Sequence, residues 1–159
     1  MDEIRLVRCL SFLLRSKSVQ LHRPAFLDDF FARKLSQLLS TNQSVCVPLN
    51  IANQHWVLVC LKEENVFFID SLGKSLEQYS PLCAAVVLRS EMKFRELHYR
   101  VQPDGSRICG LYCLFFAAKI FASDCSWERI CALLSPTQLL RNEAQVTAWF
   151  LHVFRRKKR

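Results

Sequence analysis

Hydrophobic positions in the first forty residues recur at helical spacing. Apolar residues that follow one another at three and four positions lie on one face of a helix. One such stripe runs between residues 3 and 15, at Ile4, Leu6, Val7, Leu10, Leu13 and Leu14. A second runs from about 25 to 39 and includes Phe26, Leu27, Phe30, Phe31, Leu35, Leu38 and Leu39. Pro24 stands where a first helical turn tolerates proline. We therefore expect amphipathic helices over residues 3–15 and 25–39.

The middle of the chain changes to the patterns that are typical of strands. Val45, Val47 and Leu49 alternate with other residues, and residues 56–61 and 66–69 are short continuous apolar runs. The polar residues 62–65 between these runs indicate a hairpin turn. We expect a further turn at 71–74, a helix through the seventies and eighties, and a strand over Leu97, Tyr99 and Val101 that ends before Pro103-Asp104-Gly105.

From Cys109 onward the pattern is helical and apolar almost all round, which is typical of a buried central helix. Amphipathic helices near 126–134 and 137–154 follow, with Ser126 and Ser135 as expected N-caps. The sum is an α+β fold in one domain, residues 1–154, in which a small, mostly antiparallel sheet packs on the central helix. A basic C-terminal tail, residues 155–159, completes the chain.

Composition narrows the classes of function. Three glycines among 159 residues exclude Gly-rich phosphate loops. No apolar run approaches the ~18 residues of a membrane span, so we expect no membrane association. The eight cysteines lie mostly inside apolar stretches, and the apolar segment from Cys9 to Leu14 is too short for a signal peptide. We therefore interpret the cysteines as small buried hydrophobes in a reducing intracellular compartment.

The net charge of +8 is concentrated at one end of the chain. Five of the positive charges lie in residues 155–159, which leaves an excess of three elsewhere. Such a run is typical of nucleic-acid binding or nuclear import. It is equally typical of a solvated end that aids solubility. The sequence leaves both interpretations open.

Four residues with chemical potential stand at the boundaries of the predicted elements. His55 begins a strand, Asp70 ends the next strand, Gln102 ends the strand before a loop, and Cys109 begins the buried helix. A tight hairpin would bring His55 and Asp70 together. Functional residues concentrate at such boundaries.

Each of these residue types has a role in thiol-based acyl transfer. A helix N-terminus and a neighbouring imidazolium both favour the thiolate form of Cys109, the nucleophile. His55 would act as general base and acid, and Asp70 would orient its ring. The Gln102 amide and the Cys109 backbone N–H would stabilise an oxyanion.

Taken singly, each residue also has a structural interpretation. A histidine at a strand start, an aspartate before Ser-Leu-Gly and a cysteine in an apolar helix are usually turn or core residues. A zinc site built from Cys109, Cys113, Cys125 and Cys131 fits poorly with the usual ligand spacing, so we expect no metal. His22, His98 and His152 lack comparable partners and are interpreted as structural or surface residues.

Taken together, the motifs resemble the adenovirus endopeptidase (adenain) family and, more distantly, the SUMO-specific proteases. The motifs are His55-Trp56, the segment Phe68-Ile69-Asp70-Ser71-Leu72-Gly73, and the stretch from Gln102 to Cys109-Gly110-Leu111-Tyr112-Cys113. Six residues separate Gln102 from Cys109, as in the adenoviral enzymes, whereas SUMO proteases usually have five. The resemblance spans roughly residues 45–150. It implies a permuted papain-like core and places Trp56 and Gly110 in the binding site.

The resemblance also implies a function. The expected activity is that of a viral cysteine endopeptidase that cleaves virion precursor proteins at Gly-containing sites. The expected setting is a monomer in the host nucleus or virion, with DNA and an activating viral peptide as cofactors and no metal or organic cofactor. The chain departs from the family at the position near Glu91, which carries no cysteine to which such a peptide could be disulfide-linked. The chain is also shorter at its C-terminal end, and its acid is Asp70 where the adenoviral enzymes mostly have glutamate.

Two alternative functions remain open at this point. A deubiquitinase or deSUMOylase-type isopeptidase would use the same residues on a folded protein tag. A DNA-binding virion protein would use the basic tail and carry a protease site that it does not need. The presence of all four site residues argues against the second alternative.

Overall fold

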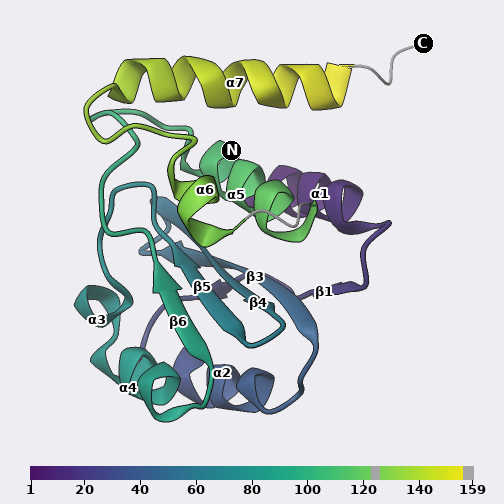
Figure 1. Cartoon of the computed structure of the whole chain (residues 1–159), viewed down its shortest axis with the longest axis vertical. Helices are drawn as coiled ribbons and strands as arrows, with labels where there is room; N and C mark the ends of the chain where they lie inside the picture. Colours follow the sequence, from purple (N-terminus) through teal and green to yellow (C-terminus); the bar gives the residue numbers. More distant parts are fainter. Residues whose placement is uncertain (123–125, 156–159) are drawn as a thin grey trace.

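A mixed β-sheet with helices against both of its faces forms the centre of the protein (Figure 1). The structure is a computed structural model that describes residues 1–122 and 126–155. The arrangement confirms the predicted α+β class in one domain. Residues 156–159 of the predicted basic tail lie outside the described residues.

The strands pair in the order β1-β3-β4-β5-β6, and β2 also pairs with β3. The central β3-β4-β5 pairings are antiparallel, as expected, whereas β1 and β2 with β3 and β6 with β5 are parallel, so the sheet is mixed. The strands are β1 (Val19–Leu21), β2 (Ala25–Phe26), β3 (Ser44–Ile51), β4 (His55–Lys62), β5 (Asn65–Ile69) and β6 (Lys93–Glu96).

The helices agree in number and order with the sequence pattern except that two stand where one was expected. They are α1 (Glu3–Leu14), α2 (Phe31–Leu39), α3 (Leu76–Tyr79), α4 (Pro81–Arg89), α5 (Cys109–Ala122), α6 (Trp127–Cys131) and α7 (Leu139–Arg155). The predicted helix of the seventies and eighties divides at Ser80, which has extended backbone and caps α4 with its side chain. None of the described helices is both long and apolar enough to cross a membrane.

Two predicted helix starts were wrong for local reasons. The helix expected from 25 begins at Phe31, because residues 25–26 pair with β3 and the Asp28 side chain accepts the N–H groups ahead of the helix. Ser126 caps α6 as predicted, but α7 begins at Leu139 and the Ser135 hydroxyl accepts the Thr137 N–H instead.

The strand expected over 97–101 was also wrong. The strand that pairs with β5 is β6, which begins four residues earlier, and residues 97–101 are irregular. Leu97 and Val101 are nevertheless buried in the same core as α5. The alternation in this segment therefore reflects burial of every second side chain, and not strand pairing.

The two faces of the sheet build two hydrophobic cores. Leu58 and Cys60 of β4 point into a core with α1, α5 and α7, whereas Val57, Val59 and Leu61 point into one with α2 and α4. Figure 1 shows these helices on opposite sides of the sheet. Eleven of the residues of α5 are buried, as expected for a central helix. The N-terminus of α5 lies at the end of the sheet where β4 begins and β5 ends.

Candidate active site

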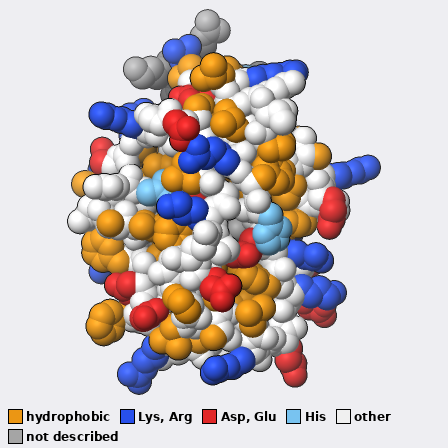
Figure 2. All heavy atoms as spheres, turned by 90° about the vertical axis from the view of Figure 1, so that its left-hand side faces the viewer, with side chains coloured by type: hydrophobic (Ala, Val, Ile, Leu, Met, Phe, Trp, Pro, Cys, Tyr) orange, Lys and Arg blue, Asp and Glu red, His pale blue; other side chains and the backbone are white. Residues whose placement is uncertain are grey.

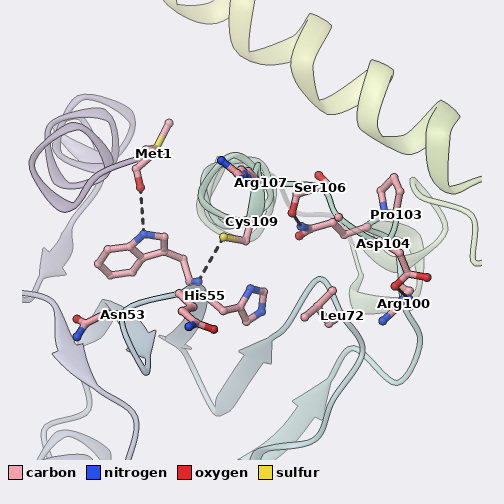
Figure 3. Close-up of a pocket in the computed structure, with 14 residues that line it drawn as sticks. Met1, Asn53, His55, Leu72, Arg100, Pro103, Asp104, Ser106, Arg107 and Cys109 are labelled. Atoms are coloured by element: carbon pink, nitrogen blue, oxygen red, sulfur yellow. Dashed lines mark hydrogen bonds and ion pairs between the residues drawn. The ribbon is translucent and has the colours of Figure 1, made fainter.

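A cleft of about 710 Å³ is lined by four of the residues that the sequence singled out, whereas Asp70 and Gly110 do not line it. His55, Trp56, Gln102 and Cys109 all line it. His55 is the first residue of β4, and Cys109 is the first of α5. Gln102 lies in the irregular loop between β6 and α5, and not at a strand end as expected. Figure 3 shows Cys109 between His55 on one side and Arg107 on the other.

His55 and Asp70 form a hydrogen-bonded pair behind the cleft. Because β4 and β5 are antiparallel, the start of one meets the end of the other, which places His55 Nε2 2.7 Å from Asp70 Oδ1. The Asp70 side chain is fully buried and that of His55 is 13% exposed. Burial alone would lower the pKa of His55, but hydrogen bonds and charge from Asp70 and Cys109 outweigh it and raise the pKa to about 9. The imidazolium form therefore predominates at neutral pH.

Asp70 remains ionised despite its burial because four groups donate to it. Besides His55, the Tyr79 hydroxyl donates to Oδ2 at 2.7 Å, and the backbone N–H groups of Leu72 and Lys74 donate at 2.8 and 3.3 Å. Burial acts to raise the pKa of Asp70, yet the hydrogen bonds from His55 and Tyr79 lower it below its ordinary value. Sequence reasoning missed Tyr79, because no motif links a tyrosine on a later helix to this carboxylate.

Cys109 is placed for ionisation. Cys109 is 7% exposed, and its Sγ accepts the backbone N–H of Trp56 at 3.4 Å. Burial acts to raise the pKa of the thiol, but hydrogen bonds from His55, Trp56 and the Gly110 N–H, with the positive charge of His55, lower it below 9.0. The positive end of the helix dipole acts in the same direction. The thiolate is thus stabilised from three sides.

The ring nitrogens of His55 divide their tasks. Because Nε2 is bonded to Asp70, Nδ1 is the nitrogen that remains for Cys109. The arrangement supports a thiolate–imidazolium pair whose cation is held by a carboxylate. Trp56 lies beside the thiol, and its indole N–H donates to the Met1 carbonyl at 3.2 Å (Figure 3).

Gln102 is fixed at both ends of its amide. It is 3% exposed; its Oε1 accepts the Ser71 hydroxyl at 2.6 Å, and its Nε2 donates to the Ser106 carbonyl at 2.8 Å. An amide nitrogen carries two hydrogens. In the described part of the chain the second has no acceptor, and the side chain lines the cleft. Sequence reasoning did not identify Ser71 as a partner of Gln102.

The other cysteines and histidines have different surroundings. Burial raises the pKa of Cys113 well above its ordinary value, and the nearby Cys109 and Cys46 act in the same direction. Among residues 1–122 and 126–155, no three His, Cys, Asp or Glu side chains are grouped as a metal site. Cys125, one of the weighed zinc ligands, lies outside the described residues.

Comparisons with known proteins give a fold. No protein-family model and no curated protein matches the sequence. The ASFV pS273R protease is similar in structure, with a TM-score of 0.58 at 13% identity, over 89% of this chain and 64% of that chain. The Ulp1 protease domain, solved in complex with Smt3, the yeast orthologue of SUMO, has a TM-score of 0.51 at 16% identity, over 82% of this chain and 71% of that chain.

A third structure covers nearly the whole of both chains. It is the central domain of the uncharacterised Lpg1148 protein from Legionella pneumophila, with a TM-score of 0.50 at 12% identity, over 93% of this chain and 97% of that chain. At these identities the likeness shows the fold. The chain has the fold of the Ulp1-like cysteine proteases.

Proposed function

We propose that this chain is a cysteine protease in which Cys109 is the nucleophile and His55 is the general acid and base. Asp70 orients the His55 ring and stabilises its positive charge. The observation that carries the proposal is the arrangement of three groups: Asp70 is hydrogen-bonded to His55, and His55 lines the same cleft as Cys109 and lowers the pKa of its thiol. The Ulp1-like protease fold supports it. A structural role alone would not account for a thiol whose pKa is lowered although the residue is buried.

The first half of the reaction forms a thioester. The Cys109 thiolate attacks the carbonyl carbon of the scissile bond, and the carbonyl π electrons move to oxygen. The Cys109 backbone N–H and the free Gln102 Nε2–H donate to that oxyanion. His55 then gives its Nδ1 proton to the leaving amine as the carbon–nitrogen bond breaks.

The second half restores the enzyme. His55, now neutral, takes a proton from water, and the resulting hydroxide attacks the thioester carbon. A second oxyanion forms at the same two donors and collapses, which expels the Cys109 thiolate and releases a carboxylic acid that gives its proton to solvent. Asp70 keeps its charge throughout and stabilises the imidazolium each time it forms.

The substrate is proposed as a polypeptide with glycine before the scissile bond, a virion precursor by the resemblance to the adenoviral enzymes. The second candidate is a ubiquitin- or SUMO-like conjugate, and the Ulp1 structure solved with Smt3 favours it. The leaving group is a backbone amine in the first case and a lysine Nζ in the second. The chemistry at Cys109 is the same.

A parallel assay separates the two candidates. The enzyme is offered ubiquitin–fluorophore, SUMO–fluorophore and a Gly-Gly-containing peptide–fluorophore, with Cys109→Ala as the inactive control. We expect turnover of the peptide at a kcat/KM within about tenfold of the tag conjugates. Turnover of the tag conjugates alone would replace the precursor proposal by the isopeptidase. Failure of all three to react faster than the control would overturn the protease proposal.

DNA as an activator, with the host nucleus or virion as the setting, is a second proposal that rests on the net charge of +8. The face in Figure 2 carries side chains of both signs among apolar patches, and no continuous basic surface. A basic contact would therefore use another face and residues 155–159. We expect DNA to increase peptide turnover, less so as salt is added, and less in a chain shortened to residues 1–154. Stimulation that is absent or independent of salt would contradict this proposal.

A further inference from the structure

We propose that Ser71 is a positioning residue that aims the Gln102 amide at the oxyanion. Ser71 follows Asp70 directly in the chain, so this dipeptide would set both ends of the site. Asp70 orients the acid–base group, and Ser71 orients the oxyanion donor. The inference rests on the proposed function, and it concerns a residue that touches neither the substrate nor the thiol.

The contact between Ser71 and Gln102 is double and buried. The two residues are 2% and 3% exposed. The Ser71 hydroxyl donates to Gln102 Oε1 at 2.6 Å, and the Ser71 carbonyl accepts the Gln102 backbone N–H at 3.1 Å. One serine therefore holds both the backbone and the end of the Gln102 side chain.

The direction of the Gln102 amide follows from hydrogen-bond chemistry. The Ser106 carbonyl can only accept, so the Gln102 group that faces it at 2.8 Å must be the Nε2 amide nitrogen. Oε1 then faces Ser71, whose hydroxyl can donate. A hydrogen bond received at Oε1 also draws electron density from the amide and strengthens Nε2–H as a donor. Ser71 thus orients the amide and increases its polarity.

The backbone on which Gln102 is mounted is already fixed. The Val101 carbonyl accepts both the Tyr112 hydroxyl of α5 and the Asn142 amide of α7, each at 3.0 Å. The Val101 N–H is bonded to the Ser71 carbonyl at 2.9 Å. The freedom that remains in this part of the site is rotation of the Gln102 side chain, which the Ser71 hydroxyl restrains together with the Ser106 carbonyl.

A double-mutant cycle tests whether Ser71 acts through Gln102. Gln102→Ala should lower kcat by about 10²–10³-fold with little change in KM, as expected for an oxyanion donor. Ser71→Ala should lower kcat by about tenfold, again with KM nearly unchanged. In the Gln102→Ala background, Ser71→Ala should have no further effect on kcat. An equal tenfold loss in both backgrounds would overturn the proposal, because the hydroxyl would then act independently of the amide.

Ser80→Ala is the matched control. Ser80 is also fully buried and donates its hydroxyl to Asp29 at 2.6 Å, on the other side of the sheet from α5. The Ser80→Ala substitution also removes a buried hydroxyl, so it should lower the stability of the protein and leave kcat per folded molecule unchanged. A tenfold fall in kcat in Ser80→Ala as well would show that the effect of Ser71 is a general response to lost stability.

A second readout does not need activity. In ¹⁵N-labelled protein the Gln102 side-chain NH₂ signals, assigned by their loss in Gln102→Ala, should show a rigid amide in the wild type and a mobile one in Ser71→Ala. Equal order in the two proteins would overturn the role of Ser71 even if the enzyme is active. If the Gln102 amide is rigid in the wild type and mobile in Ser71→Ala, but the wild type hydrolyses no substrate, the positioning role of Ser71 is supported and the proposed function is refuted.

Discussion

The first and second turns of α5 carry the same side chain in opposite electrostatic environments. Cys109 opens the helix, where the Gly110 N–H, the Trp56 N–H and the His55 imidazolium lower the pKa of its thiol. Cys113, one turn later, has no cationic neighbour among the described residues, and burial raises the pKa of its thiol well above the ordinary value. Both residues are largely buried, at 7% and 2% exposure.

This difference shows that burial alone does not decide the state of a thiol. What separates Cys109 from Cys113 is the set of donors and the one cation that reach its sulfur. Those groups come from β4 and the N-terminus of α5, and Asp70, the residue after β5, holds the cation in place.

The largest effect is expected when the side chain of Cys109 or Cys113 is replaced by the methyl group of alanine. Cys109→Ala should reduce peptide hydrolysis by on the order of 10⁶-fold, because it removes the nucleophile, and leave unfolding by urea almost unchanged. Cys113→Ala should retain hydrolysis within a few-fold and lower the free energy of unfolding by about 1 kcal/mol, because it leaves a small void in the core. Hydrolysis that survives in Cys109→Ala, or disappears only in Cys113→Ala, would reverse the comparison.

Removing the charge that holds His55 should be the next largest effect. Asp70→Asn keeps the shape but loses the carboxylate, so we expect kcat to fall by about 10³–10⁴-fold. The pKa of His55 should fall and that of the Cys109 thiol should rise, which makes Cys109 more like Cys113. Steady-state kinetics and thiol titration measure both. A kcat within tenfold of the wild type would show that Asp70 is only a turn residue.

The pH profile of kcat/KM reports the Cys109–His55 pair directly. Activity should rise as the Cys109 thiol loses its proton, at a pH below the ordinary thiol value of 9.0. It should fall again near pH 9, where His55 loses the proton that the leaving amine needs. In Asp70→Asn the two limbs should approach each other. A rate that keeps rising well above pH 9 would mean that no protonated His55 is required.

The smallest effect should come from Tyr79→Phe. The change removes one of the donors to Asp70 and leaves the others in place, so kcat should fall by about three- to tenfold. The pKa of Asp70 should rise, since the Tyr79 hydrogen bond helps to lower it. A second loss of activity, at the acid extreme below the limb set by Cys109, should then begin at a higher pH. An unchanged pH for that second loss would assign Tyr79 to packing alone.

The sequence predicted the central part of the fold because its signals are local. Polar turn residues connect β4 and β5 and mark the hairpin in the sequence. Helix α5 is apolar all round because it lies between the sheet and α7. The short parallel strands β1, β2 and β6 were not predicted. Strands of two to four residues leave no periodicity, and their partner is set by tertiary contact. In residues 97–101 the apolar residues alternate because Leu97 and Val101 are buried, and this alternation was wrongly interpreted as a strand.

The site residues were named from their places at element boundaries and from the motifs around them. Their roles remain proposals, but the structure brings Cys109, His55, Gln102 and Asp70 to one cleft and the wall behind it. The supporting residues could not be predicted. Tyr79 and Ser71 reach the site through side-chain hydrogen bonds across the fold, and the sequence separation of such contacts carries no periodic signal.

Selective labelling measures the difference between Cys109 and the other cysteines most directly. The native protein is treated with a limiting amount of a thiol-alkylating probe near pH 6.5, and each of the eight cysteines is quantified by mass spectrometry. Cys9 and Cys131 are more exposed than Cys109, but burial raises the pKa of both thiols. We predict that Cys109 reacts first, and that this preference disappears in Asp70→Asn. Earlier labelling of any other cysteine in the wild type would contradict the assignment of Cys109 as an activated thiolate.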